Sequence, residues 1–317
     1  MQNKIEYKSL FPLLTNAPIV EIVYKFKDKI NSVFALCEWY SLTGSVKDKV
    51  AYYMIKDAIR KKQVKSGGNI IEVSSGNMGI SLTAVANLLN IHTTILMPKN
   101  MSEERKKLLK MYGAKLVETE SFKKAFELCK NYQKQGYFCP QQFENNSNTK
   151  AHISVTGKQI YSKLKHKNLR CFVCGVGTSG TLMGVSKYLK NKLKIKTIGI
   201  EPNNAQILSA KPPYLKHKIQ GLSDEILPRL YNHKLVDEIL QITDQDAIAM
   251  SQKLCKELSL GIGISSGANF IGCVLSKEKS VTIFADDNKK YLTTDLSTPT
   301  TTPLVEQIEL LKIRYIK

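Results

Sequence analysis

The run CFVCGVGTSGTLMGVSKYLK, residues 171–190, joins a short apolar stretch, a glycine loop and an amphipathic stretch. The apolar stretch is typical of a buried strand, and the spacing of apolar residues after Gly180 predicts a helix. Glycines allow a tight turn and a close approach to an anion, and the free N–H groups at the helix start point at that anion. The loop from Gly175 to Thr181 is therefore predicted to cradle a phosphate group.

Similar apolar, β-branched runs recur on both sides of this unit and alternate with helical patterns. Strand and helix alternating at this spacing predict parallel sheets in an α/β protein. The sequence has no fixed-period repeat, which argues against a solenoid. The predicted strands are residues 69–74, 93–98, 114–119, 171–175, 197–202 and 281–286.

The composition is that of a globular protein. The chain has 317 residues, of which 43% are hydrophobic and 23% charged, enough for one large domain or two of ordinary size. The net charge of +20 is distributed along the chain at mostly helical spacing, which favours a solvated surface over a nucleic-acid interface. We therefore expect neither nucleic acid nor membrane as a partner.

Seven scattered cysteines and the absence of a leader pattern in residues 1–14 indicate a cytoplasmic protein with reduced thiols. Cys171 and Cys174 are expected to be small buried residues of a strand rather than a redox or metal pair. The five histidines form no metal or hydrolase constellation, so no metal is expected.

Two other stretches differ from the strand and helix pattern. Residues 139–152, CPQQFENNSNTKAH, are polar and rich in Asn, which predicts an ordered functional loop or a crossing between domains. Residues 297–303 have the composition of a linker, and residues 304–316, LVEQIELLKIRYI, are predicted to form a short amphipathic helix.

A second loop and one lysine add to the predicted phosphate cradle. The run EVSSGNMGIS, residues 72–81, ends a strand in two hydroxyls before an amphipathic helix, and a helix start of this kind suits a carboxylate. Lys47 follows the Gly-Ser turn of SLTGSVKDK, residues 41–49. The sequence allows two interpretations of this lysine: a residue that acts on a ligand or, more simply, a solvated residue at the capped start of a helix. Two anion-binding loops and a lysine are what an amino acid bound to pyridoxal phosphate requires.

The glycine loop also matches the dinucleotide pattern G-x-G-x-x-G, and Glu201 ends the next strand near the distance expected of a ribose-binding acid. This alternative predicts a bound NAD(P), but it gives Lys47 no part and does not explain the second loop.

Seven motifs, in order, resemble those of the cysteine synthase and cystathionine β-synthase family of pyridoxal-phosphate enzymes. The resemblance extends from residue 15 to about residue 296. The motifs are SLTGSVKDK, SSGNMG, QQFENNSN followed by His152, GVGTSGT, KIQGLSDEILP, GISSGA and YLTT.

The resemblance implies a fold type II, tryptophan-synthase-β-like architecture of two three-layer α/β domains with mainly parallel sheets. Residues 46–150 would form a smaller, mobile substrate-binding domain. Residues 1–45 and 151–296 would form the larger domain that binds pyridoxal 5'-phosphate, and residues 297–317 would be the linker and the C-terminal helix.

The resemblance also implies the parts of the site residues. Lys47 would form the imine with the cofactor and move the Cα proton, as only an amine can. Asn77 would lie beside the ring hydroxyl. Gln142, preferred to Gln141, would bind the substrate carboxylate together with Ser74, Ser75 and Met78. The phosphate would be held by Gly175, Gly177, Thr178, Ser179, Gly180 and Thr181.

Ser41 and Leu42 stand where the family usually has Asn-Pro, and Lys49 replaces the usual Arg, but three other departures concern the site itself. Ser179 stands where glycine is usual in the phosphate loop. Asp287 falls at the position of the serine that meets the pyridine nitrogen, where a carboxylate would protonate the ring; a shifted loop with a solvated Asp287 is the alternative. Asp224 stands where small residues are usual and could activate water or a thiol, or it could cap a helix.

The implied reaction is β-elimination followed by β-replacement through an aminoacrylate intermediate, with O-acetylserine and sulfide giving cysteine and acetate. Release of hydrogen sulfide from cysteine, with water or a thiol as acceptor, is the leading alternative, and cystathionine formation is the third. The resemblance further implies a homodimer and allows association with serine acetyltransferase.

Overall fold

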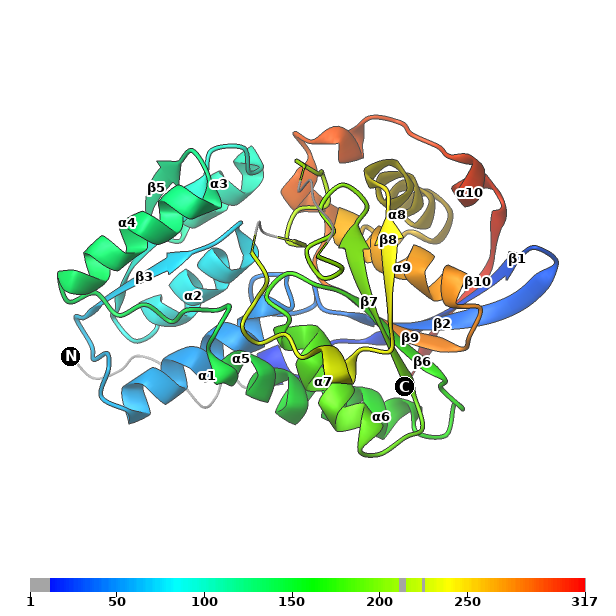
Figure 1. Cartoon of the computed structure of the whole chain (residues 1–317), viewed down its shortest axis with the longest axis horizontal. Coiled ribbons are helices and arrows are strands. Elements are labelled where there is room, and N and C mark those ends of the chain that lie inside the picture. Colours follow the sequence, from blue (N-terminus) through cyan, green and yellow to red (C-terminus); the bar gives the residue numbers. More distant parts are fainter. Residues whose placement is uncertain (1–11, 211–214, 224–225, 317) are drawn as a thin grey trace.

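The computed structural model describes residues 12–210, 215–223 and 226–316, and the strands of this part of the chain form two separate sheets (Figure 1). The large sheet has the order β10-β1-β2-β9-β6-β7-β8, and the small sheet has the order β3-β4-β5. The large sheet consists of β1 (Ile19–Phe26), β2 (Lys29–Cys37), β6 (Cys171–Gly175), β7 (Lys196–Pro202), β8 (Glu238–Ile242), β9 (Ser280–Phe284) and β10 (Ile308–Ile316). The small sheet consists of β3 (Asn69–Val73), β4 (His92–Pro98) and β5 (Lys115–Thr119).

The small sheet is all parallel and has helices on both faces. Successive residues of a strand point to opposite faces. Accordingly, Ile70 of β3 packs with α1 (Lys47–Arg60) and α2 (Asn77–Asn87), whereas Ile71 packs with α4 (Phe122–Lys134). Helix α3 (Glu103–Met111) packs on the same face as α2, against Ile95. The result is a three-layer unit.

The large sheet is also the middle of three layers. Val173 of β6 packs on one face with α8 (Asp244–Leu258) and α9 (Ile264–Ser276). Phe172 packs on the other face with α6 (Lys158–Leu164) and α7 (Gly180–Lys190). The short helix α5 (Asn146–Ala151) and the π-helical segment His152–Gly157 lead into α6. The predicted α/β class with mainly parallel sheets is therefore confirmed.

All six strands predicted from the sequence are present: the strand at 171–175 has the predicted bounds, and the other five differ from theirs by at most two residues at either end. The three strands of the small sheet lie within residues 46–150, and those of the large sheet lie on both sides of that range. The boundaries of the two domains and the mobility of the smaller one stay predictions. No helix in the described ranges combines the length and apolar character needed to cross a bilayer.

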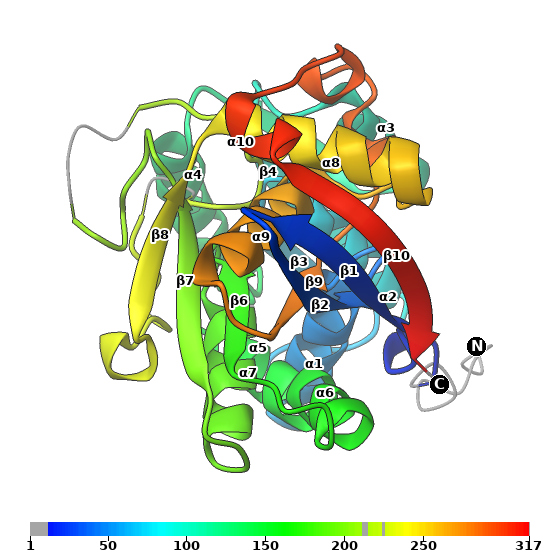
Figure 2. The same ribbon diagram turned by 90° about the vertical axis from the view of Figure 1, so that its right-hand side faces the viewer.

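The predicted C-terminal helix is wrong. After the short helix α10 (Pro303–Glu306), residues 308–316 form strand β10, which lies antiparallel to β1 at the edge of the large sheet (Figure 2). The register shifts between Val23 and Tyr24, so Leu311 is the extra residue of a bulge. Because of this bulge Leu310 and Ile313, three residues apart, both pack against the core, which imitates the spacing of an amphipathic helix.

Candidate active site

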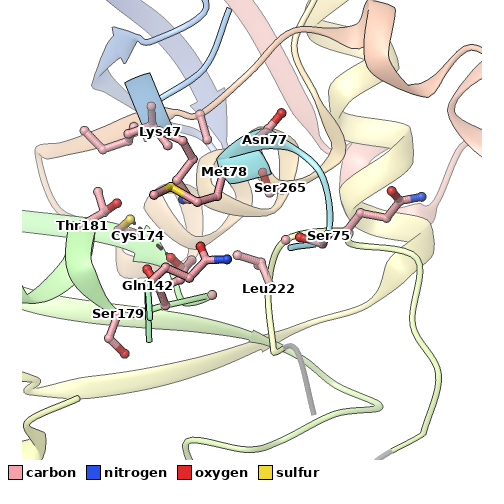
Figure 3. Close-up of a pocket in the computed structure, with 18 of the residues that line it drawn as sticks. Lys47, Ser75, Asn77, Met78, Gln142, Cys174, Ser179, Thr181, Leu222 and Ser265 are labelled. Carbon is pink, nitrogen blue, oxygen red and sulfur yellow. Dashed lines mark hydrogen bonds between the residues drawn. The ribbon is translucent and has the colours of Figure 1, made fainter. Parts of the chain in front are cut away.

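A cavity lies between the two sheets at the carboxyl ends of their strands, the usual position of ligand sites in open α/β sheets. Its walls come from the start of α1, the β3–α2 loop, the β6–α7 loop and the start of α9. Figure 3 shows ten of its side chains with labels. Of the predicted site residues, those that line it are Lys47, Ser74, Ser75, Asn77, Met78, Gln142, Gly175, Gly177, Thr178, Ser179 and Thr181.

Lys47 is the first residue of α1, and the chain before it is firmly held. The Val46 N–H donates to the carbonyl of Ala285, and the Lys47 N–H donates to Ser45 Oγ at 3.3 Å. The buried carboxylate of Asp48 accepts hydrogen bonds from Thr43 N–H at 2.7 Å and from the Ser81 hydroxyl at 2.7 Å. These contacts fix the first turn of α1, so Lys47 is presented to the cavity from a rigid element.

Lys49 has a different environment from Lys47. Its ammonium group lies 2.5 and 2.7 Å from the two carboxylate oxygens of Glu38, and both side chains are almost fully buried. Lys49 does not line the cavity. The second lysine of SLTGSVKDK is therefore a structural residue that joins α1 to the end of β2.

The β3–α2 loop presents hydroxyl and amide groups to the cavity. The Ser74 Oγ accepts hydrogen bonds from the N–H groups of Gly76 and Gly79, both at 3.0 Å, and holds the turn closed. The Asn77 Nδ2 donates to Asp286 Oδ2 at 2.7 Å, whereas the buried Asn77 Oδ1 has no hydrogen-bond partner among the described residues. An orphaned amide oxygen in this position indicates a place for a ligand group.

The β6–α7 loop is too tight for side chains at two positions. A Cβ on Gly177 would lie 2.1 Å from the Gly221 carbonyl oxygen, and one on Gly180 would lie 1.9 Å from Asn148 Oδ1. Ser179 has φ +68°, the left-handed conformation that a glycine supplies easily, and its buried hydroxyl has no hydrogen-bond partner in the described part of the chain. The loop therefore keeps the shape of a phosphate cradle despite the serine. Gly180, also predicted to hold the phosphate, is the first residue of α7 and does not line the cavity.

Gln142, and not Gln141, faces the cavity. Its amide Nε2 donates to the Val73 carbonyl at 2.7 Å, and its backbone N–H donates to Glu72 Oε2 at 3.2 Å. Asn148 in turn donates to the Gln142 carbonyl and to Thr178 Oγ1, both at 2.9 Å. The polar 139–152 loop therefore connects the two anion-binding loops.

The structure does not bring Asp287 to the cavity. Its carboxylate accepts a hydrogen bond from the Lys289 N–H at 3.2 Å, which caps the short turn after β9. Ser265, in the GISSGA motif at the start of α9, lines the cavity on this side together with Asn269. Asp224, the other acid singled out in the sequence, lies outside the described residues.

Arg105 is a cavity residue that the sequence analysis missed. It comes from α3, yet its guanidinium is buried and donates to Gln220 Oε1 at 2.8 Å, to Asp286 Oδ2 at 3.3 Å and to the Tyr291 hydroxyl at 2.5 Å. The sequence of the run SEERKKLLK is typical of a solvated helix face. Only the fold shows that the Arg105 side chain packs directly on Gly76.

Glu201 is not available to bind a ribose. Its buried carboxylate accepts hydrogen bonds from the Leu208 N–H at 2.8 Å and from the Gln241 amide at 3.0 Å, and it does not line the cavity. The residue on which the dinucleotide alternative depends is therefore used to fix the turn after β7.

The fold and the cavity together define an α/β enzyme that can hold a phosphate-bearing cofactor beside a lysine. A family model described as "Pyridoxal-phosphate dependent enzyme" matches residues 10–286, and the chain belongs to that family. The resemblance found in the sequence is thereby confirmed, as is pyridoxal phosphate as the cofactor.

Its known relatives include cysteine synthases and a hydrogen sulfide-producing enzyme. The chain is 37% identical to a cysteine synthase of Staphylococcus aureus (strain Mu50 / ATCC 700699) over 90% of this chain and 95% of that protein. It is 37% identical to cysteine synthase B of Campylobacter jejuni over 92% of this chain and 98% of that protein. The crystal structure of a hydrogen sulfide-producing enzyme from Fusobacterium nucleatum superposes with a TM-score of 0.90, at 39% identity over 97% of each chain.

Proposed function

We propose that the protein catalyses β-replacement on an amino acid and makes L-cysteine and acetate from O-acetylserine and sulfide. The observation that carries the proposal is the convergence of Lys47, the β3–α2 loop and the glycine loop on one cavity between two sheets. One loop suits a carboxylate and the other suits a phosphate, so a substrate and a cofactor would meet beside the lysine. The identity with two cysteine synthases supports the choice of substrate.

The residues fit pyridoxal phosphate. The backbone N–H groups at the start of α7, together with Thr178, Ser179 and Thr181, would hold the phosphate, in a turn that Gly177 and Gly180 keep open. Asn77, with its partnerless Oδ1, would lie beside the ring hydroxyl. When bound, the cofactor supplies an electron sink for the charge that develops at Cα.

Lys47 would act twice. Its amine would hold the cofactor aldehyde, and in the presence of the substrate the same amine would accept the proton from Cα. Ser75 and Gln142 would orient the substrate carboxylate at the N-terminus of α2.

Ser265 would be the partner of the pyridine nitrogen in place of Asp287. A hydroxyl is neutral, whereas a carboxylate would favour a protonated ring. A hydroxyl partner therefore gives a weaker electron sink, which is sufficient for loss of a β-leaving group and restricts competing reactions at Cα.

Release of hydrogen sulfide from L-cysteine is the second candidate. The likeness to the Fusobacterium nucleatum enzyme favours it, and the sequence offers Asp224 of the GLSDEILP motif as an acid for this reaction. The carboxylate of Asp224 would deprotonate water as the incoming nucleophile.

Two product assays on the purified holoenzyme test these candidates. Cysteine formation from O-acetylserine and sulfide supports the first, and sulfide release from cysteine alone supports the second. Asp224→Asn should reduce sulfide release and spare cysteine formation, with Asp246→Asn, in the first turn of α8 and outside the cavity, as the control. A holoenzyme that consumes neither donor would overturn the proposal.

We also propose that the protein acts as a homodimer, as the family resemblance implies, and that it lies in the cytoplasm, as its scattered cysteines indicate. The amino acid and a sulfide or thiol are its small-molecule partners. Association with serine acetyltransferase is a further prediction, which co-sedimentation of the two purified proteins would check.

A further inference from the structure

A second cavity lies on the α4 face of the small sheet, outside the site described above. Within it two thiols meet: Cys129 Sγ and Cys139 Sγ are 3.3 Å apart. Cys129 belongs to α4 and is buried against β3 and β4, and Cys139 is half-buried in the chain after α4. The side chains around them are those of Glu72, Val73, Phe126, Lys130, Gln133, Gln141 and Phe143.

The thiol pair shares residues with the proposed substrate site. Cys139 comes three residues before Gln142, and Glu72 lines the thiol cavity while its Oε2 accepts the Gln142 N–H at 3.2 Å. The other oxygen of Glu72 accepts the N–H of Val73, whose carbonyl binds the Gln142 side chain at 2.7 Å. A movement of the 139–142 segment therefore changes the position of Gln142.

The 139–142 segment is the part that can move when the two sulfurs approach. Cys129 is held in a 13-residue helix packed on the sheet. Cys139 lies in an irregular segment in which Gln141 has φ +56°, a conformation uncommon for a residue other than glycine. Bond formation must bring the sulfurs closer than their present contact, and the irregular segment offers less resistance than the helix.

We propose that Cys129 and Cys139 form a reversible disulfide when the protein is exposed to a peroxide. This disulfide weakens binding of the amino-acid substrate because it displaces Gln142. The Cys129 thiolate attacks one peroxide oxygen, the O–O bond breaks and a sulfenic acid forms; the hydroxide that leaves takes up the proton lost by the thiol and becomes water. The Cys139 thiol then attacks the sulfenic sulfur, the S–S bond forms, and a second water leaves. Two thiols are oxidised by two electrons and one peroxide is reduced to two waters.

The thiol pair is suited to this order of steps. The hydrogen bond from Cys139 lowers the pKa of Cys129, which therefore ionises before its partner. Cys129 and Cys139 line a cavity that gives a small oxidant access to them. In contrast, Cys37, Cys171 and Cys273 are packed inside the core of the large sheet. A reactive thiolate beside a second thiol is the arrangement that redox-sensitive pairs use.

The first test is direct detection of the bond. The holoenzyme is treated with hydrogen peroxide, its remaining thiols are alkylated, and the digest is analysed by mass spectrometry without reduction. We expect a cross-link between the peptides of Cys129 and Cys139 that dithiothreitol removes. This readout does not depend on the proposed activity, so it survives if the substrate assignment fails. Oxidation of other cysteines without this cross-link would overturn the proposal.

The second test measures the effect on the site and rests on the proposed function. Binding of O-acetylserine is followed by the visible absorbance of the cofactor, because cysteine or sulfide would reduce the disulfide. We expect peroxide to weaken binding by about 5-fold or more, the low end of typical coupling between sites, with recovery after dithiothreitol. An unchanged affinity in fully cross-linked protein would overturn the link to Gln142.

Three variants identify the responsible thiols. Cys139→Ser, at the half-buried position, and Cys129→Ala should both keep their affinity for O-acetylserine after peroxide. Cys255→Ser, a partly buried cysteine on α8, is the matched control and should respond as the wild type does. Equal loss of affinity in all three variants would place the oxidation elsewhere, for instance at Cys174 in the active cavity, and would contradict the proposal.

Discussion

At the residue scale, Lys47 and Lys49 show how position decides the part of a lysine. One residue separates them on α1, yet Lys47 lines the active cavity and Lys49 is buried against Glu38. A buried ion pair contributes little compared with an apolar pair, but removal of one partner leaves a charge without compensation. The two lysines should therefore respond differently to substitution.

Lys49→Met should lower the free energy of unfolding by about 3–5 kcal/mol, because it leaves the Glu38 carboxylate buried without a partner. The folded variant should still bind the cofactor. Urea unfolding followed by circular dichroism measures the change. Lys253→Met, which removes a partly exposed pair with Glu257, is the control and should change stability by at most about 1 kcal/mol. Equal unfolding midpoints for the two variants would refute the interpretation.

At the element scale, the β6–α7 loop should tolerate no added methyl group at Gly177. A Cβ there would lie 2.1 Å from the Gly221 carbonyl, and overpacking of this kind costs about 1–3 kcal/mol. We expect Gly177→Ala to weaken binding of pyridoxal phosphate by about 5- to 160-fold. Titration of the apoprotein measures this. Gly199→Ala in β7, whose Cβ would meet nothing closer than 3.5 Å, should bind the cofactor as the wild type does.

The last strand, β10, gives a second prediction at this scale. Ile308 is fully buried in the core of the large sheet, and Leu311 is the exposed residue of the bulge. Ile308→Ala should lower the free energy of unfolding by about 2–5 kcal/mol, and Leu311→Ala by less than about 0.5 kcal/mol. An amphipathic helix in solution would make the two substitutions equivalent, and equal unfolding curves would therefore argue against the strand.

The strands show what the sequence could predict. The six predicted strands are short buried runs, and burial on both faces of a parallel sheet leaves a continuous apolar signal. Strand β10 was mistaken for a helix because its bulge changes the spacing of inward residues from two to three. The antiparallel pairing of β10 with β1 joins the two ends of the chain, and no local pattern reveals it.

The same reasoning applies to the candidate site. Loops that follow strands carry strong local patterns, so Lys47, Asn77 and the glycine loop could be brought together from the sequence. Asp287 was assigned by counting along a motif, and the fold places Ser265 in the cavity instead. Arg105 is one of several charges in a helical run, and only packing decides which of them points inward.

At the scale of the whole molecule, Arg105 connects the two sheets across the cavity. It belongs to a helix of the small sheet, and its partners Asp286 and Tyr291 follow β9 of the large sheet. Asp286 also binds Asn77 on α2, so three segments meet at one buried carboxylate. The relative position of the two walls of the site therefore depends on this cluster.

Arg105→Met should lower the free energy of unfolding by about 3–5 kcal/mol, because it leaves the Asp286 carboxylate buried without its ion-pair partner. It should also lower kcat/KM, because it removes a connection between the two walls of the cavity. Arg60→Met, which removes an exposed pair with Asp57, is the control and should alter neither quantity by a measurable amount. Urea unfolding and steady-state rates check the prediction. A variant as stable and as active as the control would show that Arg105 is not such a connection.

The attachment site of the cofactor is the most direct test of the account. The purified holoenzyme is reduced with borohydride, which makes the bond between the cofactor and its lysine permanent, and the digested peptides are analysed by mass spectrometry. We predict the added cofactor mass on Lys47, and no such adduct together with loss of the visible band in Lys47→Ala. An adduct on another lysine, or a Lys47→Ala variant that keeps the adduct and the band, would contradict the central claim.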